Sequence, residues 1–201
     1  MRIVKSKTFN LNTKESFLIV DVGNDDRVLS VIKQREGGLM QRGYERIIGL
    51  RDMYSREYQK RSPKVINEKV TKQFIDGSVS EIQKMSHADK ITIYFSIMEL
   101  EAWFLGMYNI FTKINRKLTV QKIENDLGFN LMKVDPQKKF YRPSDQIKKI
   151  WGLCNMEYRK TEADIERFAS VMHTNDFDTA IENGRCDSFR VFYQEVSSYL
   201  N

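Results

Sequence analysis

Long hydrophobic runs are absent from this chain of 201 residues. No apolar stretch approaches the roughly 18–20 residues that a membrane-spanning helix needs, and the N-terminal MRIVKSKTFNLNTKE lacks the apolar core of a signal peptide. Linkers rich in Gly/Ser or Pro, internal repeats and low-complexity tracts are absent as well. We therefore expect a cytoplasmic protein without membrane contact, built as one good-sized domain or as a core with a smaller appended part.

Cysteine and histidine are scarce, with two residues of each. Cys154 and Cys186 have no CxxC spacing and no companions at zinc-ligand distances, so neither a disulfide framework nor a structural zinc site is indicated. His87 and His173 have no nearby nucleophile in a recognisable turn, which argues against a Ser–His or Cys–His catalytic system. The GxGxxG fingerprint is also missing, which leaves a Rossmann-like enzyme as the weakest alternative.

Hydrophobic residues make up 41% of the chain and aromatic residues 11%, which is enough for a packed core. The net charge of +6 is unevenly distributed: residues 1–90 carry 18 basic and 12 acidic side chains, residues 111–149 carry ten and four, and residues 91–110 carry only two acids. A phosphate-bearing partner is one interpretation of a basic surplus on both sides of an acidic segment, and an ordinary solvated surface is the other.

Three short segments rich in β-branched and aromatic residues predict strands, at Ser16–Val20, 44–50 and 90–98. The first is expected to be buried. Each is followed by a helix-like pattern, and three such units favour a mainly parallel sheet with right-handed crossovers. We expect an α/β fold with a small, mainly parallel sheet and flanking helices.

Turn residues predict where the intervening segments begin and end. The helix after the first strand should stop at Gly37-Gly38, and the helical pattern over 64–84 should be interrupted near Asp76-Gly77. The segment 53–63 is predicted to be an exposed loop. A helix should begin at Glu99, directly after the third strand.

The second half of the chain carries mainly helical signals. Helices are expected over 120–127 (cap Thr119, stop Gly128), 145–153, 161–172 with a Thr-x-x-Asp capping box, and 189–200. The segment 129–141 shows no clear period. We expect an α/β core over residues 1–110 and a helical subdomain over 111–201 that packs on it.

Three carboxylates are each predicted at the C-terminal end of a different strand: Asp21, Asp52 and Glu99. Because such ends lie along one edge of a parallel sheet, with strands about 4.8 Å apart, these acids could share one or two hard cations. Mg²⁺ (or Mn²⁺) suits this arrangement, since waters and substrate phosphates complete its coordination. The prediction is phosphodiester cleavage, with Asp52 and Glu99 as catalytic ligands and Asp21 as a weaker third.

Each acid also has a structural interpretation. Asp21 can cap the helix that follows, and Asp52 can pair with a neighbouring arginine. Glu99 can be stabilised by a helix dipole, an effect of roughly 0.3–1 kcal/mol. Glu101 would share the face of Glu99 only if the chain stayed extended there, so it is a reserve ligand.

Basic and aromatic residues are interleaved after the second strand. Arg51 is expected to assist phosphate binding, and Arg56, Lys60 and Arg61, with tyrosines between them, could contact nucleic acid by charge and stacking. The same composition also marks ordinary exposed loops. Three aromatic residues after the third strand could form a stacking platform, but their helical spacing favours the core: Trp103, Phe104 and Tyr108.

Four segments together resemble a bacterial family of uncharacterised proteins related to Toprim folds: GLRDMYS (49–55), IMELEAWFL (97–105), YRK (158–160) and DSF (187–189). Members carry a strand ending in Arg-Asp, a Met-Glu-x-Glu-Ala-Trp-Phe block, and later Tyr-x-Lys and Ser-Phe signatures. The resemblance spans roughly residues 17–195, and the Glu-Ala-Trp block is its most specific part. Similar proteins are encoded beside ATPases in defence-type loci, so the resemblance implies a metal-dependent nuclease, or a module derived from one, with an ATPase partner.

The chain differs from Toprim domains at two motifs. Toprim domains have a strand ending in Val-Glu-Gly, where this chain has Val20-Asp21-Val22-Gly23, and the paired Asp-x-Asp is absent because Asp52 is followed by Met-Tyr. A second function therefore stays open beside the nuclease, namely a catalytically inactive module that binds an ATPase partner or nucleic acid.

Overall fold

The computed structural model describes residues 6–10 and 16–199, and the chain forms two compact units. The first, here called the mixed unit, contains Met1–Arg51, Lys72–Phe95 and Glu195–Asn201. The second, here called the helical unit, contains Asp52–Thr71 and Ser96–Gln194. The predicted division at residue 110 follows the order of the chain and stays a prediction.

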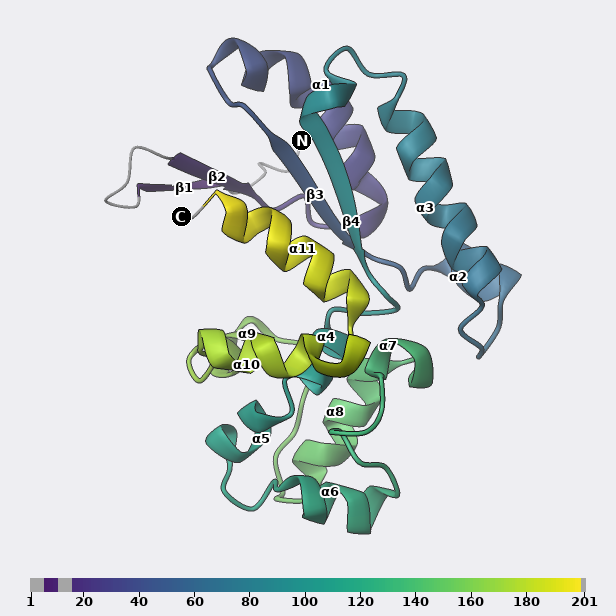
Figure 1. Ribbon diagram of the computed structural model, residues 1–201, viewed down its shortest axis with the longest axis vertical. Helices are drawn as coiled ribbons and strands as arrows, with labels where there is room; N and C mark the ends of the chain where they lie inside the picture. Colours follow the sequence, from purple (N-terminus) through teal and green to yellow (C-terminus); the bar gives the residue numbers. More distant parts are fainter. Residues whose placement is uncertain (1–5, 11–15, 200–201) are drawn as a thin grey trace. The chain divides into compact units, whose positions relative to one another are not determined.

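A parallel pair of strands forms the centre of the mixed unit. Up to residue 96 the elements are β1 (Ser6–Asn10), β2 (Ser16–Val20), η1 (Asp25–Arg27), α1 (Val28–Gln41), β3 (Ile47–Asp52), α2 (Arg56–Arg61), α3 (Glu68–Ile82), η2 (Ala88–Lys90) and β4 (Ile91–Ser96). β3 and β4 pair with each other and run in the same direction (Figure 1). The predicted α/β class with a small parallel sheet and a helical C-terminal region is confirmed.

Gly49 sets how closely α1 approaches β3. A Cβ atom at this position would lie 2.9 Å from the Ile32 side chain and 3.2 Å from that of Val28, both on α1. The absence of a side chain thus brings the buried face of α1 directly onto the strand. Ile91, Ile93 and Phe95 of β4 alternate into the same core, as their period of two predicts.

The first predicted strand does not join this sheet. β2 pairs antiparallel with β1, with Ser6 opposite Val20, and the two form a separate two-stranded sheet. The expectation of three parallel strands side by side is therefore wrong for Ser16–Val20. Its predicted burial is also wrong, because Ile19 is 60% exposed. An apolar run indicates a strand but not its partner, and here the partner is the segment directly before it.

Glycine does not end the helices where the sequence suggested. α1 continues through Gly37-Gly38 to Gln41, and α3 runs unbroken through Asp76-Gly77 to Ile82. A glycine in a helix costs about 1 kcal/mol. Burial of one face outweighs that cost, and in α3 the helix is further supported by an ion pair between Lys72 and Asp76 at 2.9 Å.

The predicted loop at 53–63 contains a helix, α2. The Ser55 side chain caps it by accepting a hydrogen bond from the Tyr58 backbone N–H at 3.1 Å. Tyr58 is fully buried, and its hydroxyl lies 2.9 Å from the Thr71 hydroxyl. The prediction of a loop rested on the many charged residues of this segment and did not take the Ser55 cap into account.

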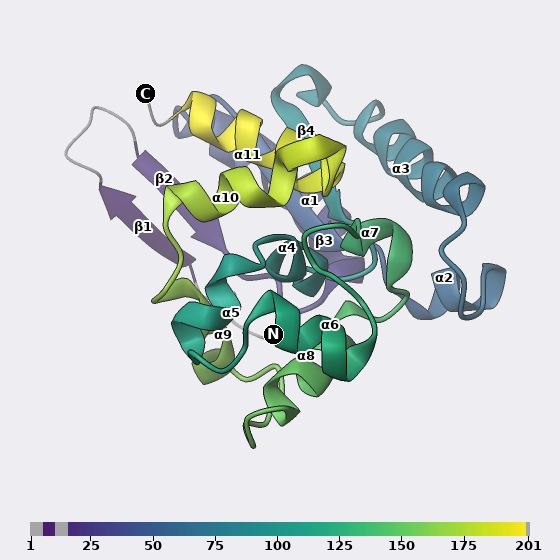
Figure 2. The same ribbon diagram turned by 60° about the horizontal axis from the view of Figure 1, so that its bottom comes forward.

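The helical unit is built around α4. Its elements from residue 101 are α4 (Glu101–Gly106), α5 (Asn109–Ile114), α6 (Val120–Leu127), α7 (Pro136–Lys139), α8 (Pro143–Gly152), α9 (Glu162–Ala169), α10 (Thr174–Ile181), η3 (Glu182–Gly184) and α11 (Asp187–Ser198), whose last turn belongs to the mixed unit. Every residue of α4 is buried, and the helix packs against α7, α8 and α10 (Figure 2). Phe168 of α9 stacks on Phe104 of α4, with ring centroids 4.6 Å apart.

Local signals located several helix ends correctly. α6 begins after a Thr119 cap and ends at Gly128, which has a left-handed φ of 75°. The capping box of α9 is formed by Thr161 and Asp164 as predicted. α7 lies inside the segment predicted to be irregular, where Asp135 caps it. In the described part of the chain, no helix has the length and apolar character needed to cross a bilayer.

Candidate functional site

The junction between β4 and α4 brings two acids together. Met98 has a positive φ of 66°, an unusual conformation for a side chain of its size, and it turns the chain after the strand. α4 begins at Glu101 rather than at Glu99, so the predicted start was two residues early. Glu99 and Glu101 are 3% and 4% exposed. Such buried carboxylates require compensating partners.

Lys160 supplies the charge compensation. Its Nζ atom lies 2.8 Å from Glu99 Oε1 and 3.0 Å from Glu101 Oε1, so one ammonium bridges both carboxylates. Glu101, predicted only as a reserve ligand, therefore lies on the same side as Glu99. Lys160 comes from the segment between α8 and α9 and has a left-handed φ of 59°.

Two further donors complete the cluster. The backbone N–H of Ser144, in the first turn of α8, donates to Glu99 Oε2 at 2.9 Å. The Tyr158 hydroxyl donates to Glu101 Oε1 at 2.7 Å. We refer to Glu99, Glu101, Lys160 and Tyr158 as the acid–lysine cluster. The groups that hold its two carboxylates come from two segments of the chain, the first turn of α8 and residues 158–160.

Electrostatics fixes the protonation states of the two partners. Burial by itself would lower the pKa of Lys160, but the attraction of Glu101 and Glu99 outweighs it, so the pKa of Lys160 is raised. Burial and the neighbouring Glu101 carboxylate raise the pKa of Tyr158. At neutral pH the lysine is therefore a charged donor and the tyrosine a neutral one, and neither can act as a general base.

Asp52 is hydrogen-bonded to the junction between β4 and α4. Its Oδ1 accepts hydrogen bonds from the Ser96 hydroxyl and, at 2.9 Å, from the Leu100 backbone N–H. The Tyr54 N–H donates to the Met98 carbonyl at 2.6 Å, which extends the pairing beyond the end of β3. Asp52 thus orders the turn that carries Glu99.

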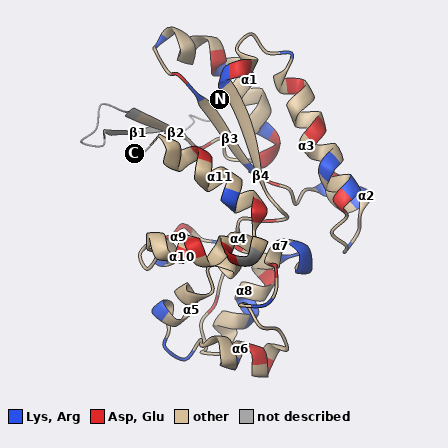
Figure 3. Cartoon of the chain, in the orientation of Figure 1, with Lys and Arg blue, Asp and Glu red and all other residues tan. Residues whose placement is uncertain are grey.

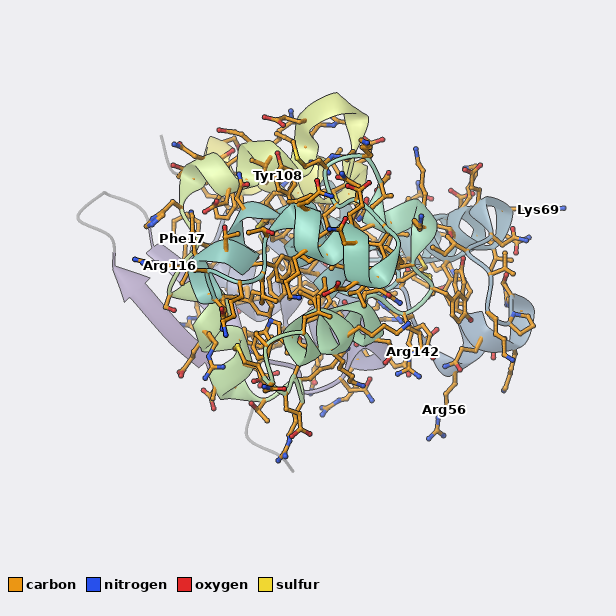
Figure 4. The ribbon with its side chains drawn as sticks, turned by 90° about the horizontal axis from the view of Figure 1, so that it is seen from below. Phe17, Arg56, Lys69, Tyr108, Arg116 and Arg142 are labelled. Atoms are coloured by element: carbon orange, nitrogen blue, oxygen red, sulfur yellow. The ribbon has the colours of Figure 1, made fainter. Side chains whose placement is uncertain are left out.

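A pocket of about 560 Å³ opens beside the acid–lysine cluster. It lies entirely within the helical unit, between the N-terminal half of α8 and the segment 156–160. Its lining comprises Arg142, Ser144, Lys148, Met156, Glu157, Tyr158, Arg159 and Lys160. Four of these eight residues are cationic, and one is acidic. Figure 4 labels Arg142, which also stacks over the Tyr54 ring at 5.2 Å.

Carboxylates compete for three of the four cations. Asp145 pairs with Lys148 at 3.2 Å and with Arg142 at 3.5 Å, and Glu157 pairs with Arg159. All five side chains in these pairs are at least 40% exposed. Exposed pairs of this kind contribute only about 0–1 kcal/mol, so an anionic ligand can replace the carboxylates.

The other predicted basic residues lie away from the pocket lining. Arg56, Lys60 and Arg61 belong to α2, where Figure 3 shows a basic stretch. Lys60 and Arg61 pair with Glu57 at 3.6 and 3.4 Å, while Arg56 projects outward (Figure 4). Their roles in nucleic-acid binding stay predictions.

Asp21 and Arg51 belong to the mixed unit. Asp21 is exposed, and its Oδ1 accepts a hydrogen bond from the Gly23 N–H at 2.7 Å, so it organises the turn after β2. Arg51 pairs with Asp26 at 3.2 Å and packs over the Phe95 ring at 5.5 Å. The predicted edge that joins Asp21 to Asp52 and Glu99 requires one sheet, and β2 lies in another.

The fit of Mg²⁺ or Mn²⁺ depends on the donors present. Within residues 6–10 and 16–199 no group of three or more His, Cys, Asp or Glu side chains could hold a metal ion. However, Glu99 Oε1 and Glu101 Oε1 both contact one cationic group, the Lys160 ammonium. Magnesium often uses only one or two carboxylates, with waters and phosphates completing its octahedron. The binding of Mg²⁺ or Mn²⁺ at this pair stays a prediction.

Two of the three aromatic residues named after β4, Trp103 and Phe104, belong to the core, as their spacing predicted. Trp103 and Phe104 are 3% and 8% exposed, and Trp103 Nε1 donates to the Ser188 hydroxyl at 2.9 Å. Tyr108, only partly buried, lies under the Arg185 guanidinium at 5.4 Å.

Cys154 and Cys186 are free thiols, and burial raises the pKa of Cys186 to about 12, which makes it unreactive.

Sequence reasoning did not find the residues that complete the site. Ser144, Lys148 and Lys160 had no assigned role, although Tyr158 and Lys160 belong to one of the signatures that carry the family resemblance. The spacing of that pair was the available signal, because residues two apart in extended chain point to the same side. The Glu-x-Glu spacing at 99–101 carries the same information.

Comparisons of this chain with protein-family models, curated proteins and solved structures find no match. The resemblance to Toprim-like proteins therefore stays a prediction. Function has to be inferred from the residues of the pocket and of the acid–lysine cluster.

Proposed function

We propose that the protein binds the phosphate groups of nucleic acid in the pocket between α8 and the segment 156–160. The observation that carries this proposal is the convergence of four cationic side chains on one pocket: Arg142, Lys148, Arg159 and Lys160. Arginine and lysine are the side chains that bind phosphate, by bidentate and by point-charge contacts respectively. The competing carboxylates pair weakly at the surface and are readily exchanged for phosphate.

Binding should depend strongly on salt and on these particular cations. In a fluorescence-anisotropy titration with a single-stranded oligonucleotide, log Kd should rise with log salt concentration, because bound phosphates release counterions. Lys148→Gln or Arg159→Gln should weaken binding about threefold to tenfold and reduce the salt slope by about one unit. The opposite change, Glu157→Gln, should strengthen binding, since Arg159 loses its competing partner.

Lys149 provides the matched control. It is exposed on α8, directly after Lys148, but it does not line the pocket. Lys149→Gln removes the same overall charge and should change affinity less than Lys148→Gln does. Equal losses for the two variants would show that binding follows net charge rather than this pocket, and the proposal would then be wrong.

We propose metal-dependent phosphodiester cleavage as a second function. The observation that favours it is the convergence of Glu99 and Glu101 on one cationic group, beside a pocket suited to phosphate. Glu99 and Glu101 would hold Mg²⁺ or Mn²⁺, which when bound activates water and stabilises developing charge. Lys160 would then be available to the phosphate, and Asp52 would position Glu99 through the Leu100 N–H.

Cleavage is tested with labelled single-stranded and duplex DNA and RNA, with Mg²⁺ or Mn²⁺ and with EDTA. We expect cleavage only with metal, and a loss of at least about a hundredfold in Glu99→Gln at unchanged affinity for the oligonucleotide. Asp52→Asn should reduce the rate less, since Asp52 acts through the backbone of the turn. Metal-independent binding without cleavage in any of these assays would leave a binding module that is not an enzyme.

A further inference from the structure

Ser144 has a buried hydroxyl group without a partner. The residue is 0% exposed, and within the described residues its Oγ has no hydrogen-bond partner, although its backbone N–H is bonded to Glu99. Buried hydroxyl groups are nearly always paired, so an unpaired one requires an explanation. Ser144 is also one of the residues that line the pocket, together with the cationic side chains.

The position of Ser144 on α8 adds two features that suit an anion. α8 has ten residues, and Ser144 is in its first turn, where the helix dipole favours negative charge. Lys148 lies four residues later and therefore on the same face of the helix. The opposite side of the pocket is formed by the segment that carries Arg159 and Lys160. A bound anion would thus meet donors from both sides.

A phosphate monoester fits this set better than an internal phosphodiester does. The terminal phosphate of a strand carries a charge of about −1.5 to −2 and three strong acceptor oxygens. An internal phosphate has a single charge and two free oxygens. Arg142, Lys148 and Arg159, whose exposed pairs with Asp145 and Glu157 an anion can displace, match the larger charge, and the unpaired hydroxyl matches the third oxygen.

We propose that the pocket recognises the phosphorylated end of a nucleic-acid strand, with the Ser144 hydroxyl and Lys148 as donors to its terminal phosphate. This inference rests on the proposed nucleic-acid binding and makes it more specific. An end-binding pocket would place the first internal phosphates of the strand near Arg142 and Arg159, the two longest side chains of the lining.

The experiment compares one single-stranded sequence, as DNA and as RNA, with a 5′-phosphate, with a 3′-phosphate and with hydroxyl groups at both ends. Wild-type protein should bind one phosphorylated form about tenfold more tightly than the form with hydroxyl ends, as expected for charge-assisted hydrogen bonds. Ser144→Ala should lose most of this preference. Lys148→Gln should also lose the preference, and Lys149→Gln should keep it.

The possible failures are distinguishable. Equal affinity for all three forms, with a clear salt slope, would overturn end recognition and leave nucleic-acid binding intact. Full preference retained in a folded Ser144→Ala variant, or in Lys148→Gln, would also overturn it. No binding of any form at low salt would overturn the proposed function together with this inference. Thermal unfolding of each variant identifies any that fail to fold, and Lys148→Gln provides an exposed substitution if Ser144→Ala is one of them.

Discussion

Replacing Lys160 with methionine should lower the free energy of unfolding by about 2–4 kcal/mol at neutral pH. The substitution leaves Glu99 and Glu101, both nearly fully buried, as neighbouring carboxylates without a counter-ion. Breaking a buried ion pair in this way costs about 3–5 kcal/mol, and we reduce this range because the Lys160 side chain is 40% exposed. Urea denaturation followed by circular dichroism measures the change.

Two comparisons isolate the cause of that loss. The double variant Lys160→Met/Glu101→Gln should recover at least half of the lost stability, since only one carboxylate remains. Lys60→Met should change stability by less than about 0.5 kcal/mol, because Lys60 is 76% exposed and pairs with Glu57, which is exposed as well. Equal effects of the two lysine substitutions would contradict the view that Lys160 compensates buried charge.

The Lys160→Met defect should also depend on pH. The raised pKa of wild-type Lys160 means that its contribution is fully present below the unfolded-state value and is lost only at high pH. The difference in stability between wild type and variant should therefore narrow as the pH rises through the folded-state pKa of Lys160, because the wild-type protein then loses its ammonium charge.

Replacing Phe168 with alanine should destabilise the protein by about 3–5 kcal/mol, the usual cost of truncating a buried aromatic residue. Phe168 is fully buried, and its ring contacts those of Phe104, Trp151 and Tyr158, with centroids 4.6, 5.4 and 6.0 Å away. Because Tyr158 also holds Glu101, oligonucleotide binding should weaken in the same variant at temperatures where it is still folded. Urea denaturation and anisotropy give the two readouts.

Ile165→Ala is the control for this prediction. Ile165 lies on the same helix, α9, but is 36% exposed, so its truncation should cost less than about 1 kcal/mol. A similar cost for both substitutions would indicate that α9 contributes through helix stability alone. The cluster of aromatic rings would then not be the centre of the helical unit's core.

The class of the fold could be predicted from local patterns, because β4 and its alternating residues are unambiguous and the caps of α6 and α9 depend on neighbouring residues alone. The sheet partner of β2 could not, since strand pairing depends on long-range contacts that an apolar run does not encode. The glycines of α1 were misleading for a related reason. The cost of these glycines to helix formation is small and depends on the local sequence. The burial of one face of α1, which outweighs it, depends on residues that are distant in the sequence.

The candidate site, like the fold, could be predicted from the sequence only in part. Glu99 and Asp52 were identifiable because they lie at or after strand ends. In the structure Asp52 ends β3 and accepts a hydrogen bond from the turn that carries Glu99. The partner of Lys160 was not identifiable, since the spacing of Tyr158 and Lys160 indicates a shared side but not a pairing with acids about sixty positions earlier. Ser144 had no role assigned from the sequence. Its unpaired hydroxyl becomes visible only when every partner around it is known.

The distance along the chain between the acids and their counter-ion has a consequence for biosynthesis. Lys160 follows Glu99 by 61 residues, so at about 5–20 residues per second it is added roughly 3–12 s later. Until then the turn after β4 carries two carboxylates without their cation, and its burial is unfavourable. The helical unit should therefore close its core only after the segment 158–160 has left the ribosome, and shorter nascent chains should remain sensitive to proteases.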